Sequence, residues 1–510
     1  MVLDFNNGSI GGFLKEKLES YTPEVISYEY GTVKSCADGI VRVSGLGTAK
    51  YGELLQFGDD VYGMALDMDL KGVSAALLGK GDSVSPGLIV RGTGRVADVC
   101  VGKELLGRVI DPLGRPLDGQ ELRCRSYRPV EMPAPAIMDR SPVDTPMETG
   151  ILAVDSMIPV GRGQRELIIG DRQTGKTSIA TAAMMNQKTS GVICVYCAIG
   201  QKASSVASLV RTLEESGTLE HSVIVVSTAS DSAAMQYLAP YAACSVAEYF
   251  MYNGKDALVI YDDLSKHAVA YRSMSLLLHR PSGREAYPGD VFYLHSRLLE
   301  RAARLSPEKG GGSMTALPIV ETMAGDISAY IPTNVISITD GQIYLESELF
   351  HAGVRPAVNV GLSVSRVGRA AQHSAMKKVS GSLRLEVAQY RDMAVFAQFG
   401  ADVDETTKRL LQRGERMTEL LKQPADRIYS LSEQTALLIA FKEDVLSPVG
   451  LKEVSDFKNR LLERLHAERS SVMKTIDESG ELSDESRESL SGCIKDFAAE
   501  WEAEKNAERQ

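Results

Sequence analysis

The sequence has little of several features on which whole classes of protein depend. It holds one tryptophan and seven cysteines among 510 residues, and no apolar run reaches the ~18 residues that a membrane-spanning helix needs. So few cysteines exclude a small disulfide-stapled scaffold and are consistent with a reducing compartment. The first residues, which include Asp4, Lys15 and Glu16, lack the basic and apolar regions of a leader peptide. We therefore expect a chain that is neither secreted nor membrane-spanning.

An excess of basic residues is also missing. Lys and Arg number 56 and Asp and Glu number 67, so the net charge is −11 and general nucleic-acid binding is disfavoured. With 44% hydrophobic and 24% charged residues, the composition is that of a folded, soluble protein rather than a disordered one. The length predicts about three domains.

The N-terminal part predicts a small β-barrel over residues 23–94. Short β-favouring runs such as 39–43 alternate with turn signals, among them Gly58-Asp59 and Lys71-Gly72, about every ten residues. In the preceding segment 1–22, residues 10–21 carry Phe13, Leu14 and Leu18 among Lys and Glu, which is typical of a short amphipathic helix. The alternative for this segment is a frayed terminus.

Residues 95–372 predict an α/β domain. Apolar, β-rich runs alternate here with helix-length segments, as in a parallel sheet that is flanked by helices and buried on both faces. A proline-rich passage over 129–146 predicts little regular structure. The runs expected to form strands are 166–169, 192–199, 223–226, 257–261 and 335–338.

Residues 373–510 predict a helical bundle. The β-favouring runs stop after Gln372, and apolar residues then recur at steps of 4, 4, 3, 4 and 3, which is one face of a helix. Similar periodicity returns over 410–421 and 454–465. The residues of the first apolar face are Val379, Leu383, Val387, Tyr390, Ala394 and Ala397.

The strongest motif is Gly-Asp-Arg-Gln-Thr-Gly-Lys-Thr, from Gly170 to Thr177. It matches the phosphate-binding pattern G-x-x-x-x-G-K-[ST] and lies between an apolar run at 167–169 and a helix-favouring segment at 178–185. Its glycines let backbone N–H groups surround phosphate oxygens, and Lys176 adds a positive charge. The Thr177 hydroxyl is suited to bind Mg²⁺ at the start of the helix.

Polar residues follow two of the predicted strands. Asp262 comes directly after the run 257–261, and an acid in this position beside a phosphate loop holds Mg²⁺, often through water. Hydrolysis also needs a group that deprotonates or orients water, usually a Glu. The run 192–199 is instead followed by Gln201, which hydrogen-bonds water but cannot take its proton. Since a Gln positions water in some nucleotide hydrolases, a catalytic and a non-catalytic site both stay open.

Other residues point less clearly to chemistry. Cys194 and Cys197 have the spacing of a redox motif but lie within an apolar strand, so we expect core cysteines. The seven histidines have no metal-ligand spacing, so no zinc site is expected. Arg366 lies among small residues that suit the presentation of a long side chain, although spacing alone favours a solvated or paired arginine.

Five segments together resemble the α subunits of F-type ATP synthase. They are the phosphate loop, Ala198-Ile-Gly-Gln-Lys202, Tyr261-Asp-Asp-Leu-Ser-Lys266, Gly283-Arg-Glu-Ala-Tyr-Pro-Gly-Asp290 and Val364-Ser-Arg-Val-Gly368. The resemblance spans essentially the whole chain, and the Asp-Arg-Gln-Thr filling of the loop is specific to this subunit. The catalytic β subunit has Gly-Glu-Arg where this chain has Gly200-Gln201-Lys202.

The resemblance implies a barrel, a P-loop nucleotide-binding domain and a helical domain, in a ring of alternating α and β subunits around a γ shaft. It also implies contacts with the δ and b subunits of the peripheral stalk, to which residues 1–22 would dock. The complex would lie on the cytoplasmic side of a bacterial plasma membrane and couple ATP synthesis or hydrolysis to proton or sodium flow. No nucleic-acid partner is implied.

By the same resemblance, this chain holds Mg-ATP or Mg-ADP without turning it over. Thr177 and Asp262 would hold the metal, Asp262 through water. Where many relatives have a glutamine two positions beyond Gln423, this chain has Ala425. The residues implied to bind the nucleotide are Gly170, Asp171, Arg172, Gln173, Thr174, Gly175, Lys176, Thr177, Ser178, Gln201, Arg355, Pro356 and Gln423.

Arg366 matches the arginine finger that the family inserts into the catalytic site of the adjacent β subunit. A guanidinium suits this role because it is always protonated and meets phosphate oxygens with a planar fork. Ser363 matches a position that the family requires for activity. The alternative is a self-sufficient homohexameric P-loop ATPase motor for secretion or polymer translocation, which Gln201 disfavours.

Overall fold

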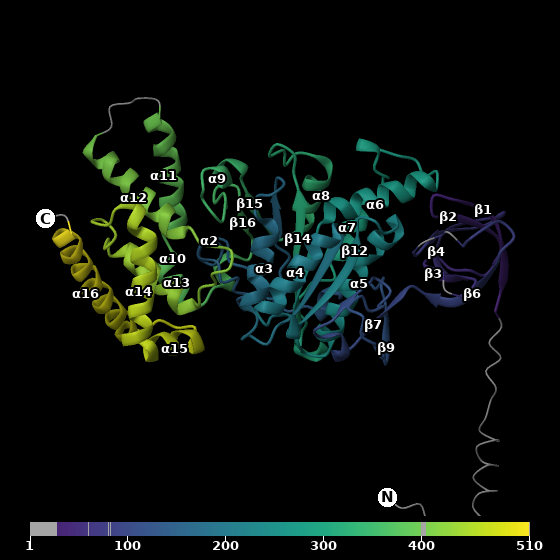
Figure 1. Cartoon of the computed structure of the whole chain (residues 1–510), viewed down its shortest axis with the longest axis horizontal. Helices are drawn as coiled ribbons and strands as arrows, with labels where there is room; N and C mark the ends of the chain where they lie inside the picture. The colour runs from purple at the N-terminus through teal and green to yellow at the C-terminus, as the bar shows by residue number, and fades with distance from the viewer. Residues whose placement is uncertain (1–27, 60, 80, 82, 399–403, 509–510) are drawn as a thin grey trace, which may run out of the picture. The chain divides into compact units, whose positions relative to one another are not determined.

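The computed structural model describes residues 28–59, 61–79, 81, 83–398 and 404–508, which form two compact units (Figure 1). The first unit contains the described residues up to 77 together with 81–96, and the second contains 78–79 and the described residues from 97 onward. The segment 1–22, for which a docking helix is expected, lies outside the described residues. Within the described part of the chain, no helix is both long and apolar enough to cross a membrane.

The first unit is a closed antiparallel barrel, as predicted. Its strands pair in the order β1-β2-β5-β4-β3-β6. Val41, Val43 and Val90 are buried between more exposed neighbours and fill the barrel together with Phe57. The strands are β1 (Tyr30–Ala37), β2 (Ile40–Gly45), β3 (Glu53–Phe57), β4 (Val61–Asp69), β5 (Gly72–Leu77) and β6 (Ile89–Val96).

The second unit is built on a sheet with the strand order β16-β15-β10-β14-β13-β11-β12-β8. Neighbouring strands run parallel except β16, which is antiparallel to β15, so the loops that follow the parallel strands gather at one edge. Helices α3, α4 and α5 pack against the central strands, which are therefore buried along their length. The strands are β8 (Val109–Ile110), β10 (Leu167–Gly170), β11 (Ile193–Gln201), β12 (Ser222–Thr228), β13 (Asp256–Asp262), β14 (Ser313–Glu321), β15 (Gly341–Leu345) and β16 (Val364–Ser365), beside the separate pair β7 (Asp98–Val101) and β9 (Ser126–Pro129).

The helices of this region connect the strands of the sheet. They are α2 (Leu152–Met157), α3 (Lys176–Asn186), α4 (Ala203–Glu215), α5 (Ala233–Tyr252), α6 (Leu264–Leu277), α7 (Val291–Leu299), α8 (Tyr330–Ile338) and α9 (Ser347–His351). Beyond Pro129, which ends β9, the proline-rich passage 129–146 has one short 3-10 turn, Ile137–Asp139, and isolated bridges at Arg140 and Pro146, which agrees with its predicted lack of regular structure.

One predicted strand is wrong. Residues 335–338 belong to helix α8, and the strand beside β10 is β15, which begins at Gly341. The reason is periodicity, because Ile331, Val335 and Ile338 are spaced by four and three residues and are all buried. A run of four apolar residues, taken alone, does not distinguish a buried strand from one face of a helix.

The C-terminal part is helical, as predicted, and shares a core with the sheet domain. The apolar face predicted over 379–397 is divided between α10 and α11, because the chain makes a turn at Gly381 and Ser382. Val379, Leu383 and Val387 are nevertheless all buried in the shared core, where α10 and α11 contact α2. The helices are α10 (Ser374–Ser380), α11 (Leu383–Gln398), α12 (Glu405–Leu421), α13 (Leu431–Lys442), α14 (Val454–Glu468), α15 (Ser470–Ser479) and α16 (Asp484–Glu508).

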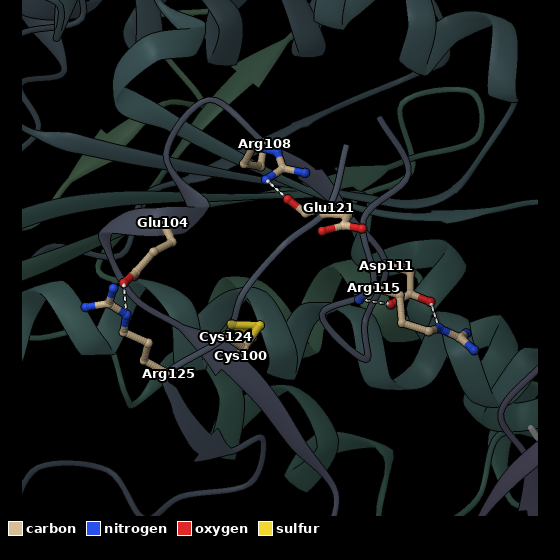
Figure 2. Close-up of a disulfide and its surroundings, with 8 residues drawn as sticks. All are labelled: Cys100, Glu104, Arg108, Asp111, Arg115, Glu121, Cys124 and Arg125. Carbon is tan, nitrogen blue, oxygen red and sulfur yellow. Dashed lines mark hydrogen bonds and ion pairs between the residues drawn. A yellow bond between two sulfur atoms is a disulfide. The ribbon is translucent and has the colours of Figure 1, made fainter. Parts of the chain in front are cut away.

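A disulfide joins Cys100 of β7 to Cys124, in the segment that leads to β9 (Figure 2). The expectation of a wholly reduced set of cysteines is therefore wrong for this pair, while Cys194 and Cys197 are buried free thiols in β11, as predicted. The cause is tertiary, because antiparallel pairing of β7 with β9 brings the two Cα atoms within 5.7 Å across a separation of 24 residues.

The loop that this disulfide closes is also held by hydrogen bonds and ion pairs. Arg108 donates to the two carboxylate oxygens of Asp118 at 2.6 and 2.8 Å and to the carbonyl of Glu121 at 3.4 Å, a contact drawn in Figure 2. Asp111 accepts a hydrogen bond from the Arg115 guanidinium at 2.6 Å in the same segment. The ring also contains β8, which pairs with β12 at the end of the sheet, so the disulfide helps to fasten an edge strand.

Alkylation of the unfolded protein should modify five cysteines before reduction and seven after it, as counted by mass spectrometry. In Cys124→Ser the partner Cys100 becomes free, so one more cysteine than in the parent chain should react without reduction. Opening a ring of this length should lower stability by about 3 kcal/mol and reduce the Tm. Reaction of all seven cysteines before reduction would contradict the disulfide.

Candidate functional site

The phosphate-loop motif forms the turn between β10 and α3. The backbone of Gln173 and Gly175 takes positive φ angles of 62° and 94° there, and Lys176 begins the helix. The Lys176 ammonium donates to the carbonyls of Gly170 and Asp171 at 2.9 and 2.5 Å, which fixes it against the loop. Burial lowers the pKa of Lys176, and the carboxylates around it oppose that shift. A fixed cation and a helix N-terminus together make an anion site of the phosphate-binding kind.

The carboxylate of Asp171 braces the loop. It accepts hydrogen bonds from the Thr322 hydroxyl at 2.6 Å, the Gly325 N–H at 2.9 Å and the Ser347 hydroxyl at 2.9 Å. These partners follow β14 or begin α9, so the loop is tied to two neighbouring segments of the sheet edge. Because its side chain is engaged in this way, Asp171 is suited to meet a phosphate through its backbone.

Hydroxyl, amide and carboxylate groups gather where α3 begins. The Thr177 hydroxyl donates to the Asp262 carboxylate at 2.9 Å, the Gln201 amide donates to it at 3.0 Å, and the Tyr196 hydroxyl also donates to it. Asp262 ends β13 and is 4% exposed, so three neutral donors orient a buried carboxylate. One carboxylate and one hydroxyl fit Mg²⁺, which keeps several waters and takes further oxygens from phosphates. Among the described residues, no group of three or more His, Cys, Asp or Glu side chains could hold a metal ion.

The end of β11 supplies an amide where hydrolysis would need a base. Gln201 is the last residue of that strand, and its side chain is hydrogen-bonded to Asp262. The neighbouring acid, Asp263, is engaged elsewhere, because it accepts from the Lys266 N–H at 2.7 Å and caps α6. Burial raises the pKa of Asp263 to about 7 despite the nearby Lys266 ammonium. The arrangement can bind phosphate and Mg²⁺ but gives water an amide rather than a carboxylate at this position.

A cavity of about 320 Å³ adjoins the phosphate loop. Ile179 of α3, Pro356 and Ala425 form parts of its apolar lining. The Arg355 guanidinium lies 4.5 Å from the centre of the Phe350 ring, and both residues border the same space. An apolar cavity with a flat cation–ring pair, next to a phosphate site, fits a nucleobase.

Gln423 fastens the segment after α12 to this cavity. Its amide nitrogen donates to the carbonyls of Gly150 and Arg427 at 2.8 and 2.6 Å, and its amide oxygen accepts from the Leu152 N–H at 3.1 Å. Its backbone N–H donates to the Arg355 carbonyl at 2.7 Å. The sequence-distant residues Arg355, Pro356 and Gln423 are therefore brought together at one cavity.

Arg366 lies toward the opposite edge of the sheet from the phosphate loop. Ser365 pairs with Gly341, the first residue of β15, and the Arg366 N–H donates to the Asp340 carbonyl at 2.9 Å. The phosphate loop instead follows the last residue of β10. The Arg366 side chain is exposed and forms no hydrogen bond or ion pair with any residue that the structure describes.

Ser363 is buried beneath the segment that carries Arg366. Its hydroxyl donates to the Asn359 carbonyl at 2.6 Å and accepts from the Tyr344 N–H at 2.9 Å. Ser363 therefore links this segment to β15 and has no exposed surface of its own.

The predicted residues thus fall into separate places. Lys176, Thr177, Gln201 and Asp262 meet at the phosphate end of the site, while Thr174, Gly175 and Ser178 border the cavity. Arg172 is exposed and pairs with Glu321 at 3.2 Å. Sequence reasoning did not identify five further residues of this region, which are Tyr196, Thr322, Ser347, Phe350 and Arg427. Thr322 and Ser347 could have been found, because they are polar residues that follow the parallel strands β14 and β15. Nothing in the sequence distinguishes an aromatic residue of the site, such as Tyr196 or Phe350, from one of the core.

Comparisons with known families match three regions of the chain to one family. Residues 150–365 match the nucleotide-binding domain of the ATP synthase alpha/beta family, residues 372–497 its C-terminal domain, and residues 26–94 its beta-barrel domain.

Curated relatives agree as well. The ATP synthase subunit alpha of Caldanaerobacter subterraneus is 56% identical over 97% of this chain and 98% of the relative. Those of Acetivibrio thermocellus and Clostridium acetobutylicum are each 54% identical, over 98% and 96% of this chain and 99% and 97% of the relatives. With a phosphate loop, a nucleotide-sized cavity and this degree of identity along its length, the chain belongs to the α subunits of F-type ATP synthase.

Proposed function

We propose that this chain binds Mg-ATP or Mg-ADP at its own phosphate loop without hydrolysing it and lends Arg366 to the catalytic site of a neighbouring β subunit. The observation that carries the proposal is the separation of the two groups. Gly170 pairs with Leu345 and Ser365 with Gly341, so the two levels lie four residues apart along β15, about 13 Å. An arginine side chain is shorter than this, so Arg366 is suited to serve a nucleotide on another chain.

Three features support the non-catalytic part of the proposal. Gln201 is held to Asp262 by its amide and cannot accept a proton from water. Asp263 is buried and caps α6. Lys176 and Thr177 are nevertheless placed to bind phosphate and Mg²⁺, so binding without turnover follows from the residues present.

The metal role of Asp262 and Thr177 rests on their oxygens. When bound, Mg²⁺ would neutralise charge on the phosphates and orient them. The Thr177 hydroxyl would reach the ion directly, and the Asp262 carboxylate, already held by Tyr196 and Gln201, would act through water.

The exposure of Arg366 supports insertion of its side chain into a site on a neighbouring chain. Its guanidinium forms no hydrogen bond or ion pair within the described residues, although its charge opposes the raised pKa of the buried Glu166, and its backbone is held to Asp340. The Ser363 hydroxyl, fixed to Asn359 and Tyr344, would position this segment rather than touch the nucleotide.

The remaining parts of the proposal concern the complex into which this chain assembles. We place this chain in a ring with β subunits around γ, tied to δ and b by residues 1–22, on the cytoplasmic side of the plasma membrane. Its functional divisions would be a barrel over 23–94, a nucleotide-binding domain over 95–372 and a helical domain over 373–510.

The purified chain should bind Mg-ATP and hydrolyse it no faster than a blank, since Gln201 supplies no base. Adding β and γ subunits should produce steady ATP turnover, measured as phosphate release. Rapid turnover by this chain alone, as a homohexamer, would instead favour the self-sufficient motor.

Replacing Arg366 by Lys keeps the positive charge but loses the planar fork, so turnover of the assembled complex should fall by about 10³ or more. ATP binding to the isolated chain should not change. Arg369→Lys is a matched control, because Arg369 is also exposed and bonds within this chain to the Lys377 carbonyl. Equal turnover in the two variants would contradict the finger assignment.

Removal of the Lys176 ammonium in Lys176→Ala should weaken Mg-ATP binding to the isolated chain by about a hundredfold, because a charge-assisted contact with phosphate is lost. Lys188→Ala, just beyond the end of the same helix, removes an exposed lysine and should leave the Kd unchanged. Titration calorimetry compares the three proteins, and an unaltered Kd in Lys176→Ala would refute the phosphate-loop assignment.

A further inference from the structure

Glu166 is a buried acid that the proposed function does not use. It comes directly before β10, its backbone N–H donates to the Ala316 carbonyl at 2.9 Å, and the residue is 0% exposed. One oxygen of its carboxyl accepts from the Gln164 amide at 2.7 Å, and the other has no hydrogen-bond partner among the described residues. A buried carboxyl with an open oxygen is costly to ionise unless a cation comes near it.

Other buried acids of the same unit are bound on both oxygens. Each carboxylate oxygen of Asp155 accepts hydrogen bonds, and both oxygens of Glu248 accept from the Arg301 guanidinium. Those two acids are fixed parts of the fold. Glu166 differs from them, because its carboxyl is not held in an ion pair and one of its oxygens stays open.

The Glu166 carboxyl lies against the pair of strands that leads to Arg366. A Cβ atom at Gly341 would lie 2.5 and 2.9 Å from its two oxygens, so glycine at this position leaves room for the carboxyl. Gly341 pairs with Ser365, the residue before Arg366. The Gln164 amide that donates to Glu166 also donates to the Ser365 hydroxyl at 3.2 Å. The carboxyl is therefore connected to the segment that carries Arg366.

Two charged side chains act on this carboxyl. Burial raises the pKa of Glu166 well above its usual range, the Asp340 carboxylate raises it further, and the Gln164 amide and the Arg366 guanidinium oppose the rise. Arg165, the neighbour of Glu166 in the chain, is bound to both carboxylate oxygens of Asp340. Among the described residues, Arg366 is thus the cation whose charge acts on Glu166.

We propose that Glu166 is a positioning residue for Arg366. While the Glu166 carboxyl is neutral, the guanidinium is free to reach a nucleotide on a neighbouring chain, and once the carboxyl is ionised it draws the guanidinium back toward this chain. The inference rests on the proposed role of Arg366 and adds the group that controls its availability. Since a buried charge interacts strongly with a nearby guanidinium, Glu166 and the nucleotide compete for Arg366 as the pH rises.

The first test compares Glu166→Gln with the unaltered chain, each assembled with β and γ subunits. Gln keeps the size of the side chain and an oxygen to accept from Gln164, but it cannot ionise. ATP turnover, measured as phosphate release, should be equal in the two complexes at about pH 6 and about fivefold higher in the variant at about pH 9. A ratio of the two rates that stays constant over this range would overturn the inference.

Two further variants separate charge from packing. Glu166→Asp keeps an ionisable carboxyl, so its turnover should still fall at alkaline pH, even if the shorter side chain changes the rate at every pH. Loss of that fall would contradict control by charge. Glu53→Gln is the matched control, because Glu53 is a buried acid of the barrel and that unit holds none of the predicted site residues. Its ratio to the unaltered complex should not change with pH.

A second measurement does not depend on the folding of a Glu166 variant. The contribution of Arg366 is the ratio of turnover in the unaltered complex to that in Arg366→Ala, and other titrating groups affect both rates. This ratio should shrink by about fivefold between about pH 6 and about pH 9, because Glu166 withdraws the arginine. A large ratio that is the same at every pH refutes only the role of Glu166. A ratio near one at every pH refutes the proposed role of Arg366 itself.

Discussion

The parallel pairing of β10 with β14 and β15 is the constraint on which both functional regions depend. Because these strands run in one direction, the loop after Gly170, the acid Asp262 and the amide Gln201 all emerge at one edge of the sheet. The same register places Arg366 beside the start of β15, at the other edge. A single sheet therefore places the phosphate loop and the Arg366 side chain at opposite edges.

A second set of contacts joins the helical region to the sheet domain. Asp155 of α2 is buried and accepts from the Gly150 N–H, from the Thr149 hydroxyl and N–H, and from the Gln434 amide of α13. Burial raises the pKa of Asp155, and its hydrogen bonds oppose the shift. Gln423 extends the connection to Gly150 from the segment after α12. The cavity beside the phosphate loop is thus closed in part by the segment 423–427, which connects α12 to α13.

Local patterns were predicted well wherever one short segment carries its own physical reason. The phosphate loop needs glycine, lysine and threonine at fixed spacing, and each has the expected place. Residues 335–338 were predicted wrongly because four apolar residues suit either a strand or a helix, and their packing against the sheet decides between them. The disulfide between Cys100 and Cys124 could not be read from spacing, since it depends on how β7 and β9 pair.

The sequence by itself determined the kinds of domain, the phosphate-binding loop and the absence of a base after β11, because each depends on residue type and local spacing. Only the tertiary structure decided which side chains are already hydrogen-bonded to other parts of the protein. Asp171 braces the loop through Thr322 and Ser347, and the amide of Gln423 bonds to backbone far away in the chain. Hydrogen bonds of this kind connect residues that lie one hundred or more positions apart, so no local sequence pattern predicts them. They determine which polar groups of each side chain stay available to bind a ligand.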